Sequence, residues 1–222
     1  MKFKKITHVL FDMDGVLLDS EPLYNQAYCN IAQQYGKFYD WDIQSKILGR
    51  NNTDSAKIVV ESLQLPISAD ELVVQQDVEF KKLFPGTKAV KGARDLIKSL
   101  SDNQTPIALA TSSNQEMMDI KAQNHQDWFV RFNAIVTGDH PEVKKGKPAP
   151  DIFLTAANCL NAKPESCLVF EDAPAGISAA ISAGMSVIAL RDPHIEEQLF
   201  AEADEIINCL TDFDGTKWGL PV

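Results

Sequence analysis

The amino-acid sequence predicts an α/β fold in which a doubly wound parallel sheet is interrupted, near its start, by an inserted helical domain. Two observations carry this prediction. After residue 86, short apolar runs of strand type alternate with segments of helical period, which is typical of a parallel sheet with helices on both faces. Between residues 19 and 86 every pattern is helical. We therefore expect an α/β core of residues 1–18 and 87–222 and an all-helical cap domain of residues 19–86.

The first strand is expected at Ile6 to Phe11, because this run is short, apolar and without helical period. A helix should follow from Glu21 to Gly36, since an apolar or aromatic residue recurs at every fourth position from Leu23. Three more helices are expected before Pro85-Gly86. The first begins at Trp41 and ends at Gly49, and the second begins at a cap at Thr53 or Asp54. The third begins at the capping box Ser68-Ala69-Asp70-Glu71 and runs towards Phe84.

The rest of the chain alternates between helices and strands. The expected helices are Gly92 to Leu100, Asn114 to Gln123, Pro150 to Leu160 and Ala173 to Ala183. The expected strands are Pro106 to Ala110, Ala134 to Thr137, Leu168 to Phe170, Ser186 to Leu190 and a short one near Ile206-Ile207. This alternation predicts a ligand site beyond the carboxyl ends of the strands.

The composition is that of an ordinary globular protein without a broad affinity for anionic polymers. Of the 222 residues, 45% are hydrophobic and 23% are charged. The net charge of −10 argues against binding to a nucleic acid polymer or an anionic membrane. No run approaches membrane-spanning length, so we expect a soluble, cytoplasmic protein. Nothing in the sequence requires more than a monomer. The cysteines have no CxxC spacing and are expected to be reduced core thiols: Cys29, Cys159, Cys167 and Cys209.

Two carboxylates at the end of the first strand give the first chemical signal. Asp12 and Asp14 are one residue apart, so both should point to the same side of a strand while Met13 points away. Two carboxylates aimed together repel each other unless a cation or a shared proton relieves the repulsion. Gly15 permits a sharp turn after the pair. The pair is therefore a candidate chemical site, with either a cation or a shared proton between the two carboxylates.

Polar residues also follow three other strands of the predicted sheet. Because the carboxyl ends of parallel strands meet at one edge, these residues should gather near the first aspartate pair. They are Thr111, Ser112, Ser113 and Asn114 after the strand at Pro106, Lys147 in the loop after the strand at Ala134, and Glu171 and Asp172 after the strand at Leu168.

These residue types match the needs of metal-assisted phosphoryl transfer. Mg²⁺ prefers oxygen ligands, and Asp12, Asp172 and Glu171 can supply them together with a substrate phosphate. One carboxylate can attack phosphorus while another serves as acid and base. Thr111, at the start of a helix, can bind phosphate oxygens, and Lys147 offsets negative charge.

Each feature also has a purely structural interpretation. Thr111 to Asn114 could form a helix cap, and Glu171-Asp172 could complement a helix dipole. The segment Asp212-Phe213-Asp214-Gly215 repeats the pattern of the first motif near the C-terminus, where we expect only a helix end or a turn. The combination of strand-end residues, rather than the acidic pair alone, therefore supports a catalytic site.

Four segments resemble, in order, the motifs of the haloacid dehalogenase superfamily. They are Asp12 to Val16, Ala110 to Ser113, Gly146 to Asp151 and Val169 to Gly176. The resemblance covers nearly the whole chain and is nearest to the phosphatase and β-phosphoglucomutase-like branch, which has a Rossmann-like core and a small helical cap. Within this branch, three further segments are similar to the pseudouridine-5'-phosphatase group: Trp41 to Ser45, Gly138 to Val143 and Trp218 to Pro221.

The resemblance implies a role for each matching residue. Asp12 is implied as the nucleophile that forms an aspartyl-phosphate, and Asp14 as the acid and base whose main-chain oxygen also reaches the metal. Asp172 is implied as a metal ligand, with Thr111 and Lys147 as phosphate binders. Further candidates are Glu171 for the metal and, for the substrate, Ser112, Asn114 and Arg50 of the cap.

We therefore expect a Mg²⁺-dependent phosphatase of a small phosphorylated metabolite. Pseudouridine 5'-phosphate is the favoured substrate, followed by other nucleotide monophosphates, sugar phosphates and glycerol phosphate. One alternative is a sugar phosphomutase, although the related mutases carry a histidine where this chain has Tyr24. Another is a catalytically silent metabolite-binding protein, against which the presence of both Asp12 and Asp14 argues.

Overall fold

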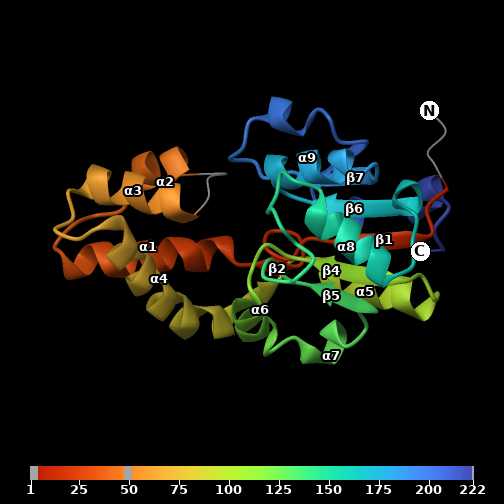
Figure 1. Ribbon diagram of the computed structural model, residues 1–222, viewed down its shortest axis with the longest axis horizontal. Coiled ribbons are helices and arrows are strands. Elements are labelled where there is room, and N and C mark those ends of the chain that lie inside the picture. The colour runs from red at the N-terminus through yellow and green to blue at the C-terminus, as the bar shows by residue number, and fades with distance from the viewer. Residues whose placement is uncertain (1–4, 48–51, 222) are drawn as a thin grey trace. The chain divides into compact units, whose positions relative to one another are not determined.

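A parallel sheet organises the larger of the two units into which the chain divides. The computed structural model describes residues 5–47 and 52–221, and it separates residues 1–19 and 88–222 from residues 20–87. The larger unit is an α/β structure and the smaller one is helical (Figure 1). The predicted fold class, a parallel α/β sheet with an inserted helical segment, is confirmed.

The six strands of the sheet lie in the order β5-β4-β1-β6-β7-β8, and every neighbouring pair is parallel. After β1 the chain builds β4 and β5 outward on one side, and then crosses to build β6, β7 and β8 on the other. The strand order therefore reverses at β1, and a crevice at its carboxyl end is the usual ligand site of such sheets. The strands are β1 (His8–Phe11), β4 (Ile107–Ala110), β5 (Ala134–Val136), β6 (Cys167–Glu171), β7 (Ser186–Leu190) and β8 (Glu205–Ile207).

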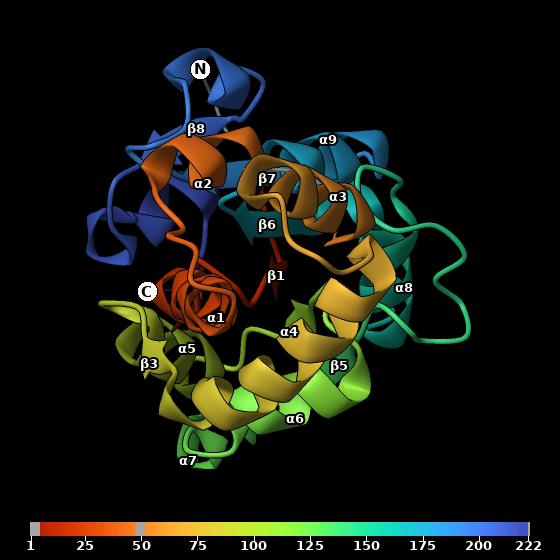
Figure 2. The same cartoon turned by 90° about the vertical axis from the view of Figure 1, so that its left-hand side faces the viewer.

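Helices cover both faces of this sheet because its central strands are apolar on both sides. Val9 and Phe11 of β1 belong to one buried cluster, and Leu10 belongs to the other. The first cluster includes residues of α5 (Ala93–Asp102), α6 (Gln115–Ala122) and α7 (Gln126–Phe129). The second includes α8 (Asp151–Cys159) and α9 (Pro174–Ser182). Figure 2 shows α8 and α9 on one side of the strands and α5 on the other.

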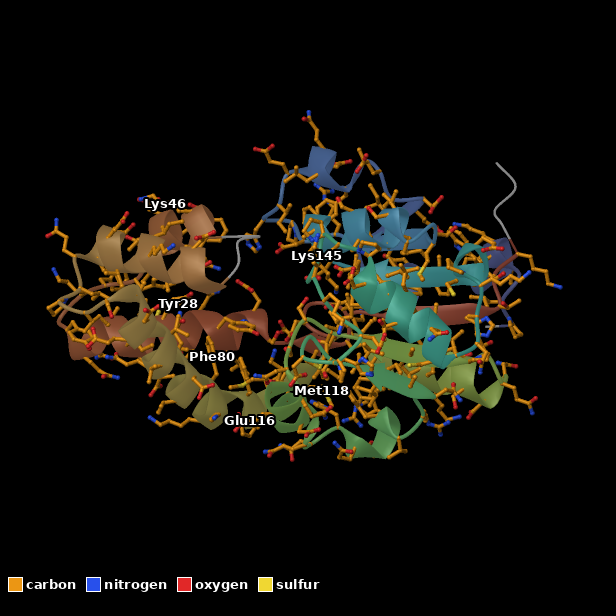
Figure 3. All side chains as sticks on the ribbon, in the orientation of Figure 1. Tyr28, Lys46, Phe80, Glu116, Met118 and Lys145 are labelled. Atoms are coloured by element: carbon orange, nitrogen blue, oxygen red, sulfur yellow. The ribbon has the colours of Figure 1, made fainter. Side chains whose placement is uncertain are left out.

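The helical unit has its own apolar core. Its helices are α1 (Glu21–Gln34), α2 (Trp41–Ile47), α3 (Asn52–Leu63) and α4 (Ala69–Leu83). Tyr28 of α1 belongs to this core, and Phe80 of α4 is buried outside it; both are labelled in Figure 3. The predicted capping box is present: the Ser68 hydroxyl accepts the N–H of Glu71 at 3.2 Å, and the Glu71 carboxylate accepts the N–H of Ser68 at 2.7 Å.

Several local expectations need correction. Helix α3 begins at Asn52, before both predicted caps, so Asp54 lies in its first turn, where its charge complements the helix dipole. A two-stranded antiparallel ribbon, β2 (Leu18–Asp19) with β3 (Lys88–Ala89), was not expected. The four cysteines are free, but only Cys167 is buried; Cys29 and Cys209 are partly buried and Cys159 is exposed.

Short 3-10 helices complete the secondary structure. They lie at Phe84–Gly86, Pro164–Ser166, Glu197–Phe200, Leu210–Asp212 and Gly215–Trp218. The acidic repeat near the C-terminus has the structural role expected of it, since the Asp214 carboxylate accepts the N–H of Thr216 at 3.1 Å and caps the last of these helices. Across residues 5–47 and 52–221, no helix is both long and apolar enough to span a membrane.

Candidate active site

Asp12 lies directly after β1, the strand at which the order of the sheet reverses. Its N–H donates to the carbonyl of Phe170 at 3.0 Å, so the ladder with β6 fixes its backbone. Its side chain is buried. Burial and the nearby negative charges of Glu171 and Asp14 raise the pKa of Asp12 to about 7, although Lys147 acts in the opposite direction. A buried carboxylate among other carboxylates is a group that a cation would stabilise.

Lys147 joins two of these carboxylates. Its Nζ donates to Oδ1 of Asp12 at 2.5 Å and to Oε1 of Glu171 at 2.6 Å. The lysine side chain is almost fully buried, and its ammonium also lies 4.9 Å from the ring centre of Phe153. The two carboxylates raise the pKa of Lys147 despite its burial. Lys147 therefore provides a fixed positive charge beside Asp12, at the position that the strand-end argument predicted.

Glu171, the last residue of β6, binds donors of the protein with both carboxylate oxygens. Oε1 accepts from Lys147, and Oε2 accepts the N–H groups of Asp172 at 2.8 Å and Ala173 at 2.9 Å. Gly176 leaves the space that this carboxylate occupies, since a Cβ there would lie 1.7 Å from Oε1. Glu171 thus orients both the lysine and the loop that carries Asp172.

Asp172 is half-buried and belongs to the same group of charges. Burial and the neighbouring carboxylates of Glu171 and Asp12 raise the pKa of Asp172 well above its usual value. Its carboxylate lies against Gly15, in the turn that follows Asp14. Asp12, Lys147, Glu171 and Asp172 are therefore brought together in the structure.

Asp14 has a separate partner, Lys121 of α6, which the sequence analysis did not identify. The Lys121 Nζ donates to both carboxylate oxygens of Asp14, at 2.7 and 2.8 Å, and to the hydroxyl of Ser113 at 3.0 Å. The sequence offers only a weak signal, since Lys121 lies three residues after Met118 and one before Ala122; the structure shows that this face of the helix is buried. A lysine on an apolar face needs a buried acidic partner.

The polar residues of the loop after β4 differ in burial and in the groups they contact. Thr111 is buried, and its hydroxyl accepts the N–H of Ser113 at 3.1 Å. Ser112 is exposed, and its carbonyl lies so close to Gly138 that a Cβ on that glycine would be 2.4 Å away. The Asn114 side chain accepts the N–H of Met117 at 2.9 Å, which is the helix-cap interpretation left open for this residue.

The donor set at this edge of the sheet fits Mg²⁺. Among the described residues, no three histidine, cysteine, aspartate or glutamate side chains form a ready metal cage. Mg²⁺ does not need one, because it keeps several waters and uses one or two carboxylates with substrate oxygens. Asp12 and Asp172 meet that need, since burial, together with the neighbouring carboxylates, raises the pKa of each, and a bound divalent cation would favour their charged forms.

One candidate residue has no structural account. Arg50, expected to contact the substrate from the helical unit, lies outside the described residues.

Comparisons with known proteins give this arrangement a family. The model of the family described as haloacid dehalogenase-like hydrolase matches residues 6–184. (DL)-glycerol-3-phosphatase 2 of Arabidopsis thaliana is 41% identical over 221 residues, a match that covers 97% of this chain and 92% of that protein. A Drosophila melanogaster protein named "Probable pseudouridine-5'-phosphatase" is also 41% identical over 221 residues, with coverages of 98% and 96%.

A solved structure agrees with these matches. The HAD hydrolase, family IA, variant 3 of Entamoeba histolytica is similar, with a TM-score of 0.81 and 26% identity, over 96% of this chain and 97% of that one. The resemblance inferred from the four motifs is confirmed. Since the family model spans residues 6–184 and relatives match nearly the full length of the chain, the protein belongs to the haloacid dehalogenase-like hydrolase family.

Proposed function

We propose that the protein is a Mg²⁺-dependent phosphatase of a small phosphomonoester and that Asp12 is its nucleophile. The proposal rests on the surroundings of Asp12. Asp12 lies at the carboxyl end of the central strand, and the ammonium of Lys147 donates to its carboxylate. The negative charge of Asp14 contributes to the raised pKa of Asp12. This arrangement places a carboxylate, a cation and a second carboxylate where a doubly wound sheet binds its ligand. The phosphatase names of two relatives support the same reaction class.

The reaction has two displacement steps. In the first, a carboxylate oxygen of Asp12 forms a bond to phosphorus, the bond from phosphorus to the alcohol oxygen breaks, and that oxygen takes a proton from Asp14. In the second, water attacks the phosphorus of the aspartyl-phosphate and gives its proton to Asp14, and the bond from phosphorus to Asp12 breaks. Inorganic phosphate leaves, and both aspartates return to their starting states.

Charge stabilisation comes from the surrounding residues. Lys147 neutralises part of the charge on Asp12 and on the phosphoryl oxygens. Asp12, the main-chain oxygen of Asp14, and Asp172 would hold Mg²⁺, which would supply positive charge to the phosphate oxygens when bound. Glu171 stays a candidate ligand, although its two oxygens already bind protein donors. Thr111, at the loop before α6, is proposed to bind phosphate, with Ser112 and Asn114 as further candidates.

Residues 20–87 are proposed to act as a cap domain that selects the substrate. Arg50 stays a predicted substrate contact of this unit. Pseudouridine 5'-phosphate and glycerol 3-phosphate are the two candidate substrates, because the relatives named for them match this chain equally well. We propose that the protein acts on small phosphorylated metabolites as a cytoplasmic monomer, without a nucleic acid polymer or a membrane.

The mutase alternative is disfavoured by the surroundings of Tyr24. Its ring packs edge-to-face on Phe80 and Phe84, with centroids 4.9 and 5.1 Å apart, which is the contact of an aromatic packing residue. The histidine of the related mutases has no counterpart there. The silent-binder alternative is disfavoured by the Asp12, Lys147 and Asp14 contacts, since a protein without turnover has no need for them.

Release of inorganic phosphate from a panel of metabolites tests the proposal. The panel holds pseudouridine 5'-phosphate, other nucleotide monophosphates, sugar phosphates, glycerol 3-phosphate, phenyl phosphate and p-nitrophenyl phosphate, each with Mg²⁺. We expect turnover of at least one metabolite and its loss in Asp12→Asn, with the circular dichroism spectrum unchanged. Turnover by Asp12→Asn at the wild-type rate would remove Asp12 as the nucleophile, and no turnover of any compound would favour the silent binder.

A further inference from the structure

We propose that Lys121 is a positioning residue that holds the carboxylate of Asp14 where it can give its proton to the leaving group. The inference rests on the proposed function, because it assigns a role in the proton transfer of a phosphatase. Lys147 and Lys121 thus have different roles: Lys147 binds the nucleophile Asp12, and Lys121 binds Asp14, the acid and base.

Contacts to both oxygens hold the Asp14 carboxylate in one orientation. The ammonium of Lys121 donates to both of its oxygens, at 2.7 and 2.8 Å. The hydroxyl of Ser113 donates to Oδ2 at 3.2 Å and accepts from the same ammonium at 3.0 Å. Three groups thus close a small network, and rotation of the carboxylate would break at least one of its contacts. Charge-assisted hydrogen bonds of this kind are stronger than neutral ones.

The position of Lys121 is set by its helix. Helix α6 begins at Gln115, where the side chain of Asn114 caps the N–H of Met117. Two turns later, Lys121 lies on the same buried face as Met118, whereas Glu116 is exposed; Figure 3 labels Met118 and Glu116. Packing of this face against the sheet therefore fixes the base of the lysine side chain, so the ammonium has little freedom to follow a moving carboxylate.

Burial separates this pair from an ordinary surface ion pair. The side chain of Lys121 is 0% exposed, while that of Asp14 is 27% exposed. The ammonium is withdrawn from water, and the carboxylate still has an accessible part through which a proton can pass to a substrate. Burial of a lysine ammonium is costly and is tolerated only with polar partners in good geometry. A purely structural lysine could have been placed on the surface at no cost.

The basicity of the leaving group separates proton delivery from general structural support. Phenyl phosphate and p-nitrophenyl phosphate have nearly the same shape, but phenolate is a much stronger base than p-nitrophenolate and needs a proton more when it departs. The first displacement step limits kcat/KM when formation of the aspartyl-phosphate is irreversible. A defect in the proton donor therefore lowers kcat/KM for phenyl phosphate selectively.

The experiment compares Lys121→Met with wild type on both substrates, with Mg²⁺ present. We expect kcat/KM for phenyl phosphate to fall about 10²-fold, the scale on which a misplaced group slows a reaction, and that for p-nitrophenyl phosphate to fall less than about threefold. Lys98→Met is the matched control, since Lys98 is an exposed lysine of α5 in the same unit, and it should change neither value. Equal losses on both substrates would overturn the inference.

A double-mutant cycle with Asp14→Asn shows whether Lys121 acts through Asp14. In the Asp14→Asn background, Lys121→Met should cause no further selective loss on phenyl phosphate, because the proton donor is already absent. If the losses of kcat/KM in the two single variants multiply in the double variant, Lys121 does not act through Asp14, and the inference is overturned. Lys121→Arg, which keeps a cation, should recover part of the selective loss. It also provides the comparison if Lys121→Met shows a lowered melting temperature.

These outcomes are distinct from failure of the proposed function. Hydrolysis by wild type that is lost in Asp12→Asn establishes a phosphatase with an aspartate nucleophile, whatever Lys121 does. Absence of hydrolysis across the whole panel would contradict the proposed phosphatase activity, and the proposed role of Lys121 would fail with it.

Discussion

The carboxylate of Asp172 occupies the space that a side chain on Gly15 would need. A Cβ built on Gly15 would lie 1.9 Å from Oδ2 of Asp172. Gly15 also has a φ of +78°, which L side chains rarely adopt. The glycine after the aspartate pair therefore has two functions: it permits the turn, and it lets a carboxylate from another strand end approach the turn closely.

Gly15→Ala should weaken Mg²⁺ binding by about 10- to 100-fold, the usual effect of disturbing the support of a metal ligand. The added methyl group must displace the Asp172 carboxylate, since a side-chain end moves more easily than the backbone. Isothermal titration calorimetry with Mg²⁺ measures the change. Gly184→Ala is the matched control, because Gly184 has the same φ of +78° and nothing within 4 Å of its Cβ position. Equal losses of affinity in both variants would assign the effect to backbone strain.

Gly176→Ala should reduce kcat through Lys147. The methyl group would overlap the Glu171 carboxylate, which orients the ammonium of Lys147 beside Asp12. We expect a loss of about 10²-fold, with KM changed little, because the displaced charge acts on the transition state. Steady-state kinetics on the best substrate of the panel checks this. Gly86→Ala, with open space at its Cβ position, should retain full activity. An unchanged kcat in Gly176→Ala would show that the Glu171 to Lys147 contact is dispensable.

Chelation with EDTA should stop turnover, and Mg²⁺ should restore it. Ca²⁺ should inhibit, because it takes about six to eight oxygen ligands at longer distances and would leave the phosphate misplaced relative to Asp12. Phosphate release measured with each ion in turn tests the metal. Full activity in EDTA would contradict the Mg²⁺ assignment, and rapid turnover with Ca²⁺ would contradict the geometric argument.

The metal-free protein should lose stability as the pH rises towards neutrality. Asp12 has a pKa of about 7 in the folded state and about 3.8 when unperturbed, so between these values the folded chain binds more protons than the unfolded chain. The free energy of unfolding therefore falls with rising pH across this window. Asp172 shifts in the same direction. Because Mg²⁺ competes with these protons, it should raise the melting temperature more at about pH 8 than at about pH 5.

Thermal unfolding with EDTA and with Mg²⁺ at both pH values measures this linkage. In Asp12→Asn, part of the pH dependence should disappear, because the substituted amide does not titrate. A melting temperature of the metal-free wild type that rises steadily from about pH 5 to about pH 8 would contradict the charge arrangement around Asp12.

Most of the fold could be predicted because local pattern and tertiary structure agree. The run before Asp12 is apolar on both sides, which suits a central strand, and the Ser68 to Glu71 capping box forms as its residues indicate. The strand-end argument brought Lys147 to Asp12 across 135 positions of the chain. Such pairings follow from parallel topology, which fixes the edge at which distant residues meet.

The parts that could not be predicted depend on contacts without a local signature. Lys121 belongs to a short helix of mixed composition, and a lysine in such a helix is usually solvated. Only the tertiary structure shows that its face of the helix is buried against Asp14. Likewise, the sequence allows Asn114 to be either a helix cap or a substrate ligand. In the structure its side chain accepts the N–H of Met117, as a helix cap does. The β2 and β3 strands are too short for any pattern to reveal.

The pairing of Leu18 with Ala89 and of Asp19 with Lys88 brings the two ends of residues 20–87 side by side. The inserted residues therefore leave and re-enter the α/β unit at one point, and we expect that they can be removed without changing the order of the strands. A two-residue Asn-Gly turn from Asp19 to Lys88 would close β2 and β3 into a hairpin in its natural register. The shortened chain should keep the parallel sheet, as circular dichroism and gel filtration would show, and aggregation would indicate that the α/β unit depends on its insert. Under the proposed function, exchange of residues 20–87 would change the substrate range without altering Asp12.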